Sequence, residues 1–135
     1  MPRCILTSPC LEDLINSLKC LRSDNTVWLR GAEPLAYRVW ICVKEVRGSC
    51  AMGYKPGECF LFEKFYIRDV GRGLCLHALA SMLTLLSPLL KGVSARILGI
   101  GGEEDAGYVQ CPDPGKPYTC GGTVVFELRR EKVKE

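Results

Sequence analysis

The chain has 135 residues, which suits one domain with a substantial hydrophobic core. Its composition, 47% hydrophobic and 24% charged, is that of a folded globular protein and excludes an intrinsically disordered chain. The net charge of +3 comes from 18 basic and 15 acidic side chains, a mild balance that does not favour a nucleic-acid partner.

The first 35 residues are expected to form an extension that contains one amphipathic helix. Leucine and isoleucine recur at helical spacing within 9–22, with acidic side chains near its start and basic ones near its end. The segment lacks the apolar run and cleavage site of a secretory signal, so a cytoplasmic location is expected. This helix is the candidate contact with a protein partner or with a second copy of the chain.

The rest of the chain predicts two strands, one helix and two further strands. Alternating or aromatic-rich patterns indicate the strands, and the apolar run 74–90 indicates a buried helix. That run is too short and too often interrupted by polar side chains to span a membrane. A type II turn is predicted at Lys55–Glu58, with proline second and glycine third. The expected strands are 37–46, 59–67, 108–111 and 122–130.

This order of elements predicts an α+β fold. A small antiparallel sheet of about four strands is expected to pack on one central apolar helix, with the N-terminal amphipathic helix as an addition. The core domain then covers 36–130, after the extension 1–35 and before a solvated tail, 131–135.

Nine cysteines are many for a chain of this size, and their number is odd. Without a secretory signal, an odd count argues against a complete disulfide framework. No pair has the C-x-x-C spacing of zinc ribbons or iron–sulfur sites. One disulfide, between Cys59 and Cys120, is a hypothesis that suits a hyperthermophilic host.

Three cysteines are predicted to lie where elements begin or end, which is where sites form on a rigid scaffold. Cys50 falls in a turn, Cys75 at the start of the helix, and Cys111 between a strand and a proline-rich corner. The helix dipole favours a thiolate at Cys75, and thiolates bind soft metal ions such as zinc or iron–sulfur clusters. The alternative interpretation is that these cysteines simply fill the core, because free cysteine is often buried.

His77 is the only histidine in the sequence. If Cys75 and His77 both lay inside the helix, their spacing would place them on nearly opposite faces. They can share a ligand only if Cys75 precedes the first turn. A Cys75–His77 nucleophile–base pair fails by the same geometry, so enzymatic activity is the least supported function and no catalytic residue is predicted.

Three stretches, "GSCAMGYKPGE" (48–58), "RGLCLHAL" (72–79) and "YVQCPDPGKPYTCGGTVVFEL" (108–128), together resemble a family of small uncharacterised prokaryotic domains. The resemblance covers roughly 37–130 and implies no established activity. It implies a cysteine site formed by Cys50, Cys75 and Cys111, with Asp113 or His77 as a candidate fourth ligand. Cys59 and Cys120 do not stand at the family's cysteine positions.

The sequence therefore leaves two functions open. The first is a cysteine-based module that binds a soft metal ion or responds to redox change through Cys50, Cys75 and Cys111. The alternative is a non-catalytic interaction or adaptor domain, whose cysteines are structural core residues and whose N-terminal helix or basic segment 36–73 contacts a partner.

Overall fold

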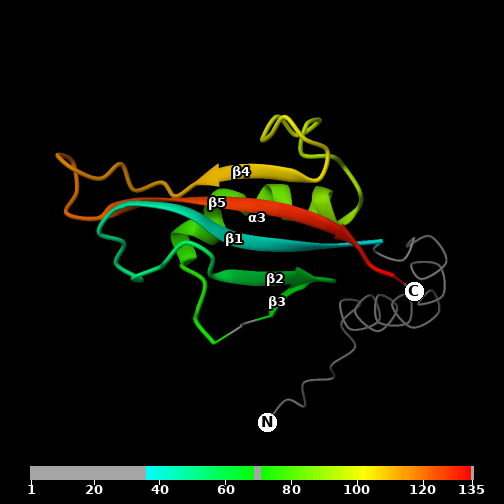
Figure 1. Cartoon of the computed structure of the whole chain (residues 1–135), viewed down its shortest axis with the longest axis horizontal. Helices are drawn as coiled ribbons and strands as arrows, with labels where there is room; N and C mark the ends of the chain where they lie inside the picture. The colour runs from blue at the N-terminus through cyan, green and yellow to red at the C-terminus, as the bar shows by residue number, and fades with distance from the viewer. Residues whose placement is uncertain (1–35, 69–70, 135) are drawn as a thin grey trace, which may run out of the picture. The chain divides into compact units, whose positions relative to one another are not determined.

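The computed structural model describes residues 36–68 and 71–134, so the predicted extension with its helix at 9–22 lies outside the described residues. The described part forms one antiparallel sheet of five strands in the order β3-β2-β1-β5-β4, together with one helix (Figure 1). The elements are β1 (Tyr37–Gly48), β2 (Cys59–Glu63), β3 (Tyr66–Arg68), α3 (Leu76–Leu90), β4 (Ala106–Gln110) and β5 (Gly122–Lys132).

The expected fold class is wrong, because the protein is rich in sheet and has five strands rather than about four around a central helix. The segment 59–67, predicted as one strand, forms two short strands that pair as a hairpin. Lys64 lies at the turn between them with a positive φ of 56°. The sequence gives no signal for this turn, because the run contains no glycine or asparagine, and lysine is an unusual residue in the left-handed region.

The two long strands, β1 and β5, are the centre of the sheet and confirm the strands predicted over 37–46 and 122–130. They pair from Tyr37 with Lys132 to Gly48 with Gly122, with one register shift between Val43 and Glu45. Alternate side chains point to one face, where they are completely or almost completely buried. These buried side chains are Val39, Ile41 and Val43 of β1, and Val124, Phe126 and Leu128 of β5.

Helix α3 packs against this apolar face of the sheet. Ala78, Met82, Leu86 and Leu89 recur at helical spacing and are buried in the same core cluster as the strand residues. The helix ends where Gly92 takes a φ of 89° and donates its N–H to the carbonyl of Leu89 at 3.1 Å. No helix of the described part is long and apolar enough to cross a membrane.

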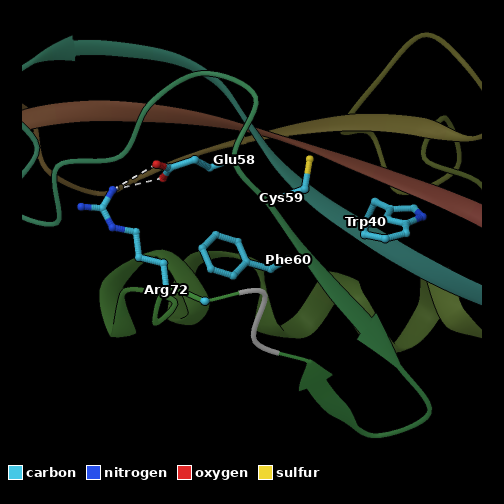
Figure 2. A pocket seen from close by; sticks show the side chains of 6 residues that line it. Trp40, Glu58, Cys59, Phe60 and Arg72 are labelled. Carbon is cyan, nitrogen blue, oxygen red and sulfur yellow. Dashed lines mark hydrogen bonds and ion pairs between the residues drawn. The ribbon is translucent and has the colours of Figure 1, made fainter.

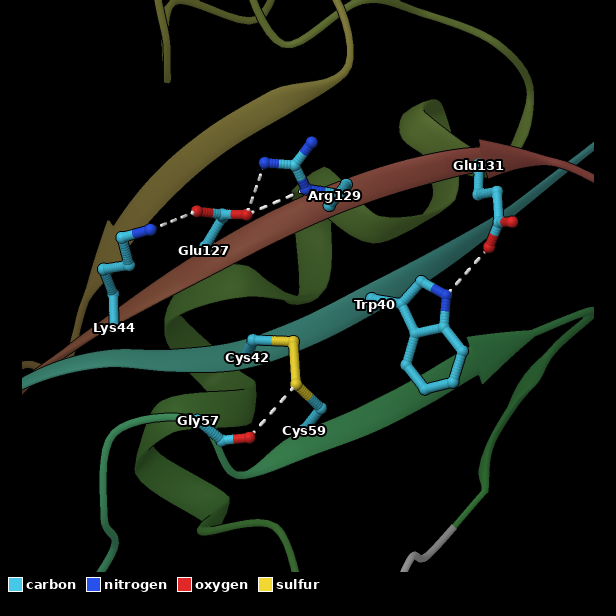
Figure 3. Close-up of a disulfide and its surroundings, with 8 residues drawn as sticks. All are labelled: Trp40, Cys42, Lys44, Gly57, Cys59, Glu127, Arg129 and Glu131. Carbon is cyan, nitrogen blue, oxygen red and sulfur yellow. Dashed lines mark hydrogen bonds and ion pairs between the residues drawn. A yellow bond between two sulfur atoms is a disulfide. The ribbon is translucent and has the colours of Figure 1, made fainter.

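The opposite face of the sheet carries ion pairs and one disulfide (Figure 3). The carboxylate of Glu127 accepts hydrogen bonds from Lys44 at 3.0 Å and from Arg129 at 2.9 Å. These bonds, led by the one from Lys44, hold the pKa of Glu127 below its ordinary value, although burial opposes the shift. The side chain of Glu127 is only 10% exposed, so its two cations replace most of the lost water.

The disulfide joins Cys42 to Cys59, and the hypothesis of a Cys59–Cys120 bond is therefore wrong. Cys42 and Cys59 stand opposite each other in the β1–β2 register, with their Cα atoms 4.1 Å apart. This spacing is typical of a non-hydrogen-bonded antiparallel pair, in which facing side chains are closest. The bond closes the loop between β1 and β2.

That loop contains the predicted type II turn, which is confirmed. Glu58 donates its N–H to the carbonyl of Lys55 at 3.2 Å, and Gly57 has a φ of 94°. At the base of the loop, Val43 donates to the carbonyl of Glu58 and accepts from the N–H of Gly57, both at 2.8 Å.

Removal of the disulfide should destabilise the fold. The substitutions Cys42→Ser and Cys59→Ser together should lower the free energy of unfolding by about 3 kcal/mol, because the unfolded chain regains the freedom of the closed loop. Urea denaturation measures the loss. Cys120→Ser, which removes an exposed free thiol, should leave the stability unchanged, and a similar loss in both variants would contradict the prediction.

The ion pairs of Glu127 with Lys44 and Arg129 should make the stability of the fold depend on pH. Because the pKa of Glu127 is lower in the folded than in the unfolded state, its contribution is complete above the unfolded value and disappears as pH falls through the folded value. Glu127→Gln should cost about 1–2 kcal/mol at neutral pH and nothing in strong acid, as followed by urea denaturation across pH. Glu45→Gln, which breaks the exposed pair with Arg47, should have a smaller effect.

Candidate functional site

A pocket of about 320 Å³ lies at the end of the sheet where β1 ends, β4 ends and α3 begins. In Figure 1 this is the end from which the loops after β1 and β4 project. We call it the thiol pocket, because three free cysteines line it. The lining side chains that carry a sulfur, imidazole or carboxylate group are Cys50, Met52, Cys75, His77, Cys111 and Asp113. The structure thus brings together all five residues that the sequence singled out, and adds Met52.

The pairing of β1 with β5 places two of the three thiols. Their pairing ends where Gly48, the last residue of β1, faces Gly122, the first residue of β5, and there the backbones approach so closely that a Cβ on Gly122 would lie 2.6 Å from the amide nitrogen of Ser49. Cys50 follows two residues after Gly48, in a turn closed by a 2.8 Å bond from the N–H of Gly53 to the carbonyl of Cys50. Cys111 follows β4 and donates its N–H to the carbonyl of Val124 at 2.8 Å.

The third thiol, Cys75, precedes the first turn of α3. It is the N-cap residue, with φ −58° and ψ 131°, and its carbonyl accepts the first helical bond from Leu79 at 2.9 Å. Cys75 therefore lies before the first turn, which is the position it needs in order to share a ligand with His77. Both residues line the same pocket. No side chain caps this helix and its first turn has no acidic residue, so the partial positive charge of the helix N-terminus lies at the pocket uncompensated by either.

Tyr54 ties the turn of Cys50 to the helix start of Cys75. Its hydroxyl donates to the carbonyl of Gly73 at 2.9 Å and accepts from the N–H of Cys75 at 2.6 Å. Its ring lies edge-on to Phe60 and Phe126 in the core, and only 4% of the residue is exposed. Burial is the main cause that raises the pKa of Tyr54, and the thiols of Cys75 and Cys50 act in the same direction.

Sequence reasoning missed Tyr54. It stands within "MGYKPG", a turn-rich stretch in which a tyrosine is expected to be exposed. The one available signal was a large aromatic residue between two turns, where it has no local reason to occur.

Asp113 organises the loop that follows Cys111. Its Oδ1 accepts hydrogen bonds from the hydroxyl of Thr119 and from the N–H of Gly115, the latter at 2.9 Å. The bond from Thr119 is the main cause that lowers the pKa of Asp113, and the Gly115 N–H and a charge on His77 act in the same direction. The carboxylate also packs so closely against Gly121 that a Cβ there would displace it. Asp113 therefore already stabilises the loop through these two hydrogen bonds.

The pocket thiols line one pocket but do not form a preformed chelate. Among residues 36–68 and 71–134, no three histidine, cysteine, aspartate or glutamate side chains are arranged to hold a metal ion. Cys50, Cys75 and Cys111 are each half-buried and pack against the core cluster, whereas Cys120 is exposed and does not line the pocket.

A second pocket, of about 460 Å³, lies at the edge of β2 (Figure 2). Trp40, Cys59 and Phe60 line it, together with Glu58 and Arg72, which form an ion pair with a shortest distance of 3.1 Å. The sulfur of Cys59 is held in the disulfide. This pocket therefore presents no thiol of its own to a ligand.

No protein-family model matches the sequence, and neither a curated protein nor a solved structure is significantly similar to it. The resemblance to the small prokaryotic domain family stays a prediction. The grouping of Cys50, Cys75 and Cys111 accordingly rests on the geometry of the thiol pocket.

Loss of the Tyr54 hydroxyl should loosen the thiol pocket. Tyr54→Phe leaves the N–H of Cys75 without its partner and should cost about 1–2 kcal/mol of unfolding free energy. Labelling of the pocket thiols by a disulfide reagent should become faster. Tyr118→Phe, at a residue that is 81% exposed, is the matched control and should change neither quantity. Equal effects of the two substitutions would show that Tyr54 does not hold the pocket.

Proposed function

We propose that this protein is a thiol-based module that binds a soft metal ion in the thiol pocket, through Cys50, Cys75 and Cys111. The observation that carries the proposal is that three cysteines far apart in the chain, on three separate elements, line one pocket and are all free. Thiolates are the preferred ligands of soft and borderline metal ions such as zinc, cuprous ion and iron–sulfur clusters.

The burial of the three cysteines supports this proposal over a purely structural role. Core residues of this fold such as Ile41 and Phe126 are completely buried. Cys50, Cys75 and Cys111 instead pack against the core on one side and line the pocket on the other. A cysteine that served only as a small hydrophobic residue would be expected among the completely buried ones.

The start of α3 places partial positive charge beside the pocket. The first turn of α3 presents its N–H groups without a capping side chain. A set of metal-bound thiolates carries negative charge, so this end of the helix is compatible with such a set.

His77 is a better candidate than Asp113 for a fourth ligand. Oδ1 of Asp113 already accepts two hydrogen bonds that hold its loop. The exposed imidazole of His77 makes no hydrogen bond or ion pair to any described residue, and it shares the pocket with Cys75. Imidazole suits zinc and copper.

Binding must bring the thiols closer together than they stand here, because no three candidate ligands of the described residues are yet arranged for chelation. A cysteine side chain changes position by rotating about a single torsion angle among three staggered positions. Cys50 and Cys111 lie in loops, where small backbone shifts are tolerated. We therefore expect chelation to be coupled to a local closing of the pocket.

The proposal is tested by metal content and metal affinity. Protein purified without chelator should contain bound metal by elemental analysis, and the reduced apoprotein should take up one equivalent of Zn²⁺ or Cd²⁺. Cys50→Ser, Cys75→Ser and Cys111→Ser should each weaken binding by at least about 10-fold, because even groups outside the ligand shell contribute that much.

Cys120→Ser is the matched control, because it removes an exposed thiol that does not line the pocket. It should bind metal as the unaltered chain does. If the three pocket variants behave like Cys120→Ser, the proposal is wrong. If the pocket thiols bind no metal but form a disulfide under mild oxidant, a redox-responsive role replaces metal binding.

A further inference from the structure

Met52 is a sulfur-bearing pocket residue to which neither the core cluster nor the loop hydrogen bonds give a role. It stands at the third position of the turn Cys50–Gly53, and 36% of it is exposed. The three pocket cysteines pack against the core cluster, but Met52 does not belong to that packing. Its side chain instead lines the thiol pocket.

Sulfur is the most frequent donor atom among the side chains that line the pocket. They offer three thiols, one thioether and one imidazole, together with two hard donors, the hydroxyl of Thr119 and the carboxylate of Asp113. That carboxylate is engaged by Gly115 and Thr119. Thiolate and thioether sulfur together favour cuprous ion, whereas carboxylate, carbonyl and water oxygens favour magnesium, calcium and manganese.

The arrangement of the donors also favours cuprous ion over zinc. Structural zinc sites use four ligands, drawn from cysteine, histidine and carboxylate side chains. No three such side chains of the described residues are placed for one ion. A soft monovalent ion needs fewer strong ligands, so two thiolates and a thioether suffice for it. Cys50 and Met52 belong to one turn, and Tyr54, two residues further on, joins that turn to the backbone of Cys75.

We propose that the natural ligand of the thiol pocket is a soft monovalent cation, cuprous ion by chemical class, and that the thioether of Met52 is one of its ligands. This inference rests on the proposed function, since it requires that the pocket thiols bind metal. Binding displaces the protons of the ligating thiols to solvent, and the oxidation states of copper and sulfur do not change.

The experiment uses the full chain in a background in which Cys4, Cys10, Cys20 and Cys120 are replaced by serine. The pocket cysteines are then the only free thiols, while the Cys42–Cys59 disulfide stays oxidised. Under anaerobic conditions the protein competes with the chromophoric ligand bicinchoninate for cuprous ion. In a parallel titration it competes with a zinc-binding dye for Zn²⁺.

We expect one cuprous ion per chain. Met52→Leu, which keeps the size and apolar character of the side chain, should weaken cuprous binding by at least about 10-fold and leave the Zn²⁺ affinity unchanged. X-ray absorption of the copper-loaded protein should show a sulfur-dominated shell that loses one sulfur in Met52→Leu.

Three results would overturn the inference in distinguishable ways. If Met52→Leu binds cuprous ion as tightly as the background protein, Met52 is not a ligand. If the pocket takes up Zn²⁺ stoichiometrically but loses cuprous ion to bicinchoninate, the site binds metal of another class and only this inference fails. If neither ion binds, the proposed function fails with it.

Discussion

The pairing of β1 with β5 is the constraint on which the rest of the structure depends. These strands come from opposite ends of the described chain, yet they align from Tyr37–Lys132 to Gly48–Gly122 and form the centre of the sheet. A one-residue slip would turn every buried side chain to the wrong face, so the hydrophobic pattern fixes this register. The register in turn brings the loop after β1 beside the loop before β5.

The thiol pocket is a consequence of that register. Gly48 and Gly122 allow the two backbones to approach closely at the end of the sheet, and the chains that leave there carry Cys50 and Cys111. Helix α3 packs on the apolar face of the sheet with its N-terminus at this end, which places Cys75 in the pocket as well. Tyr54 then fixes the distance between two of the three segments, because its ring is held in the core and its hydroxyl is bound to the backbone of Cys75.

The disulfide cysteines and the pocket cysteines lie in different parts of the fold. Cys42 and Cys59 face away from α3, where they are direct cross-strand neighbours and form a disulfide. The pocket cysteines lie at the end of the sheet and at the helix N-terminus, and none of them is in a disulfide. The disulfide closes the loop that carries Cys50, Met52 and Tyr54, so an oxidised pair limits the freedom of the segment that supplies pocket residues.

Local sequence patterns were enough to predict the two long strands, the apolar helix and the turn at Lys55–Glu58, and to place Cys50, Cys75 and Cys111 near the ends of elements. These depend on local patterns: alternation, helical spacing, and the special backbone of proline and glycine. Only the folded chain shows the break at Lys64, the Cys42–Cys59 bond, the hydrogen bonds of Tyr54 and the position of Met52 in the pocket lining. Each of these depends on which segments become neighbours, and the pattern within one segment does not say which strand or helix that segment will pack against.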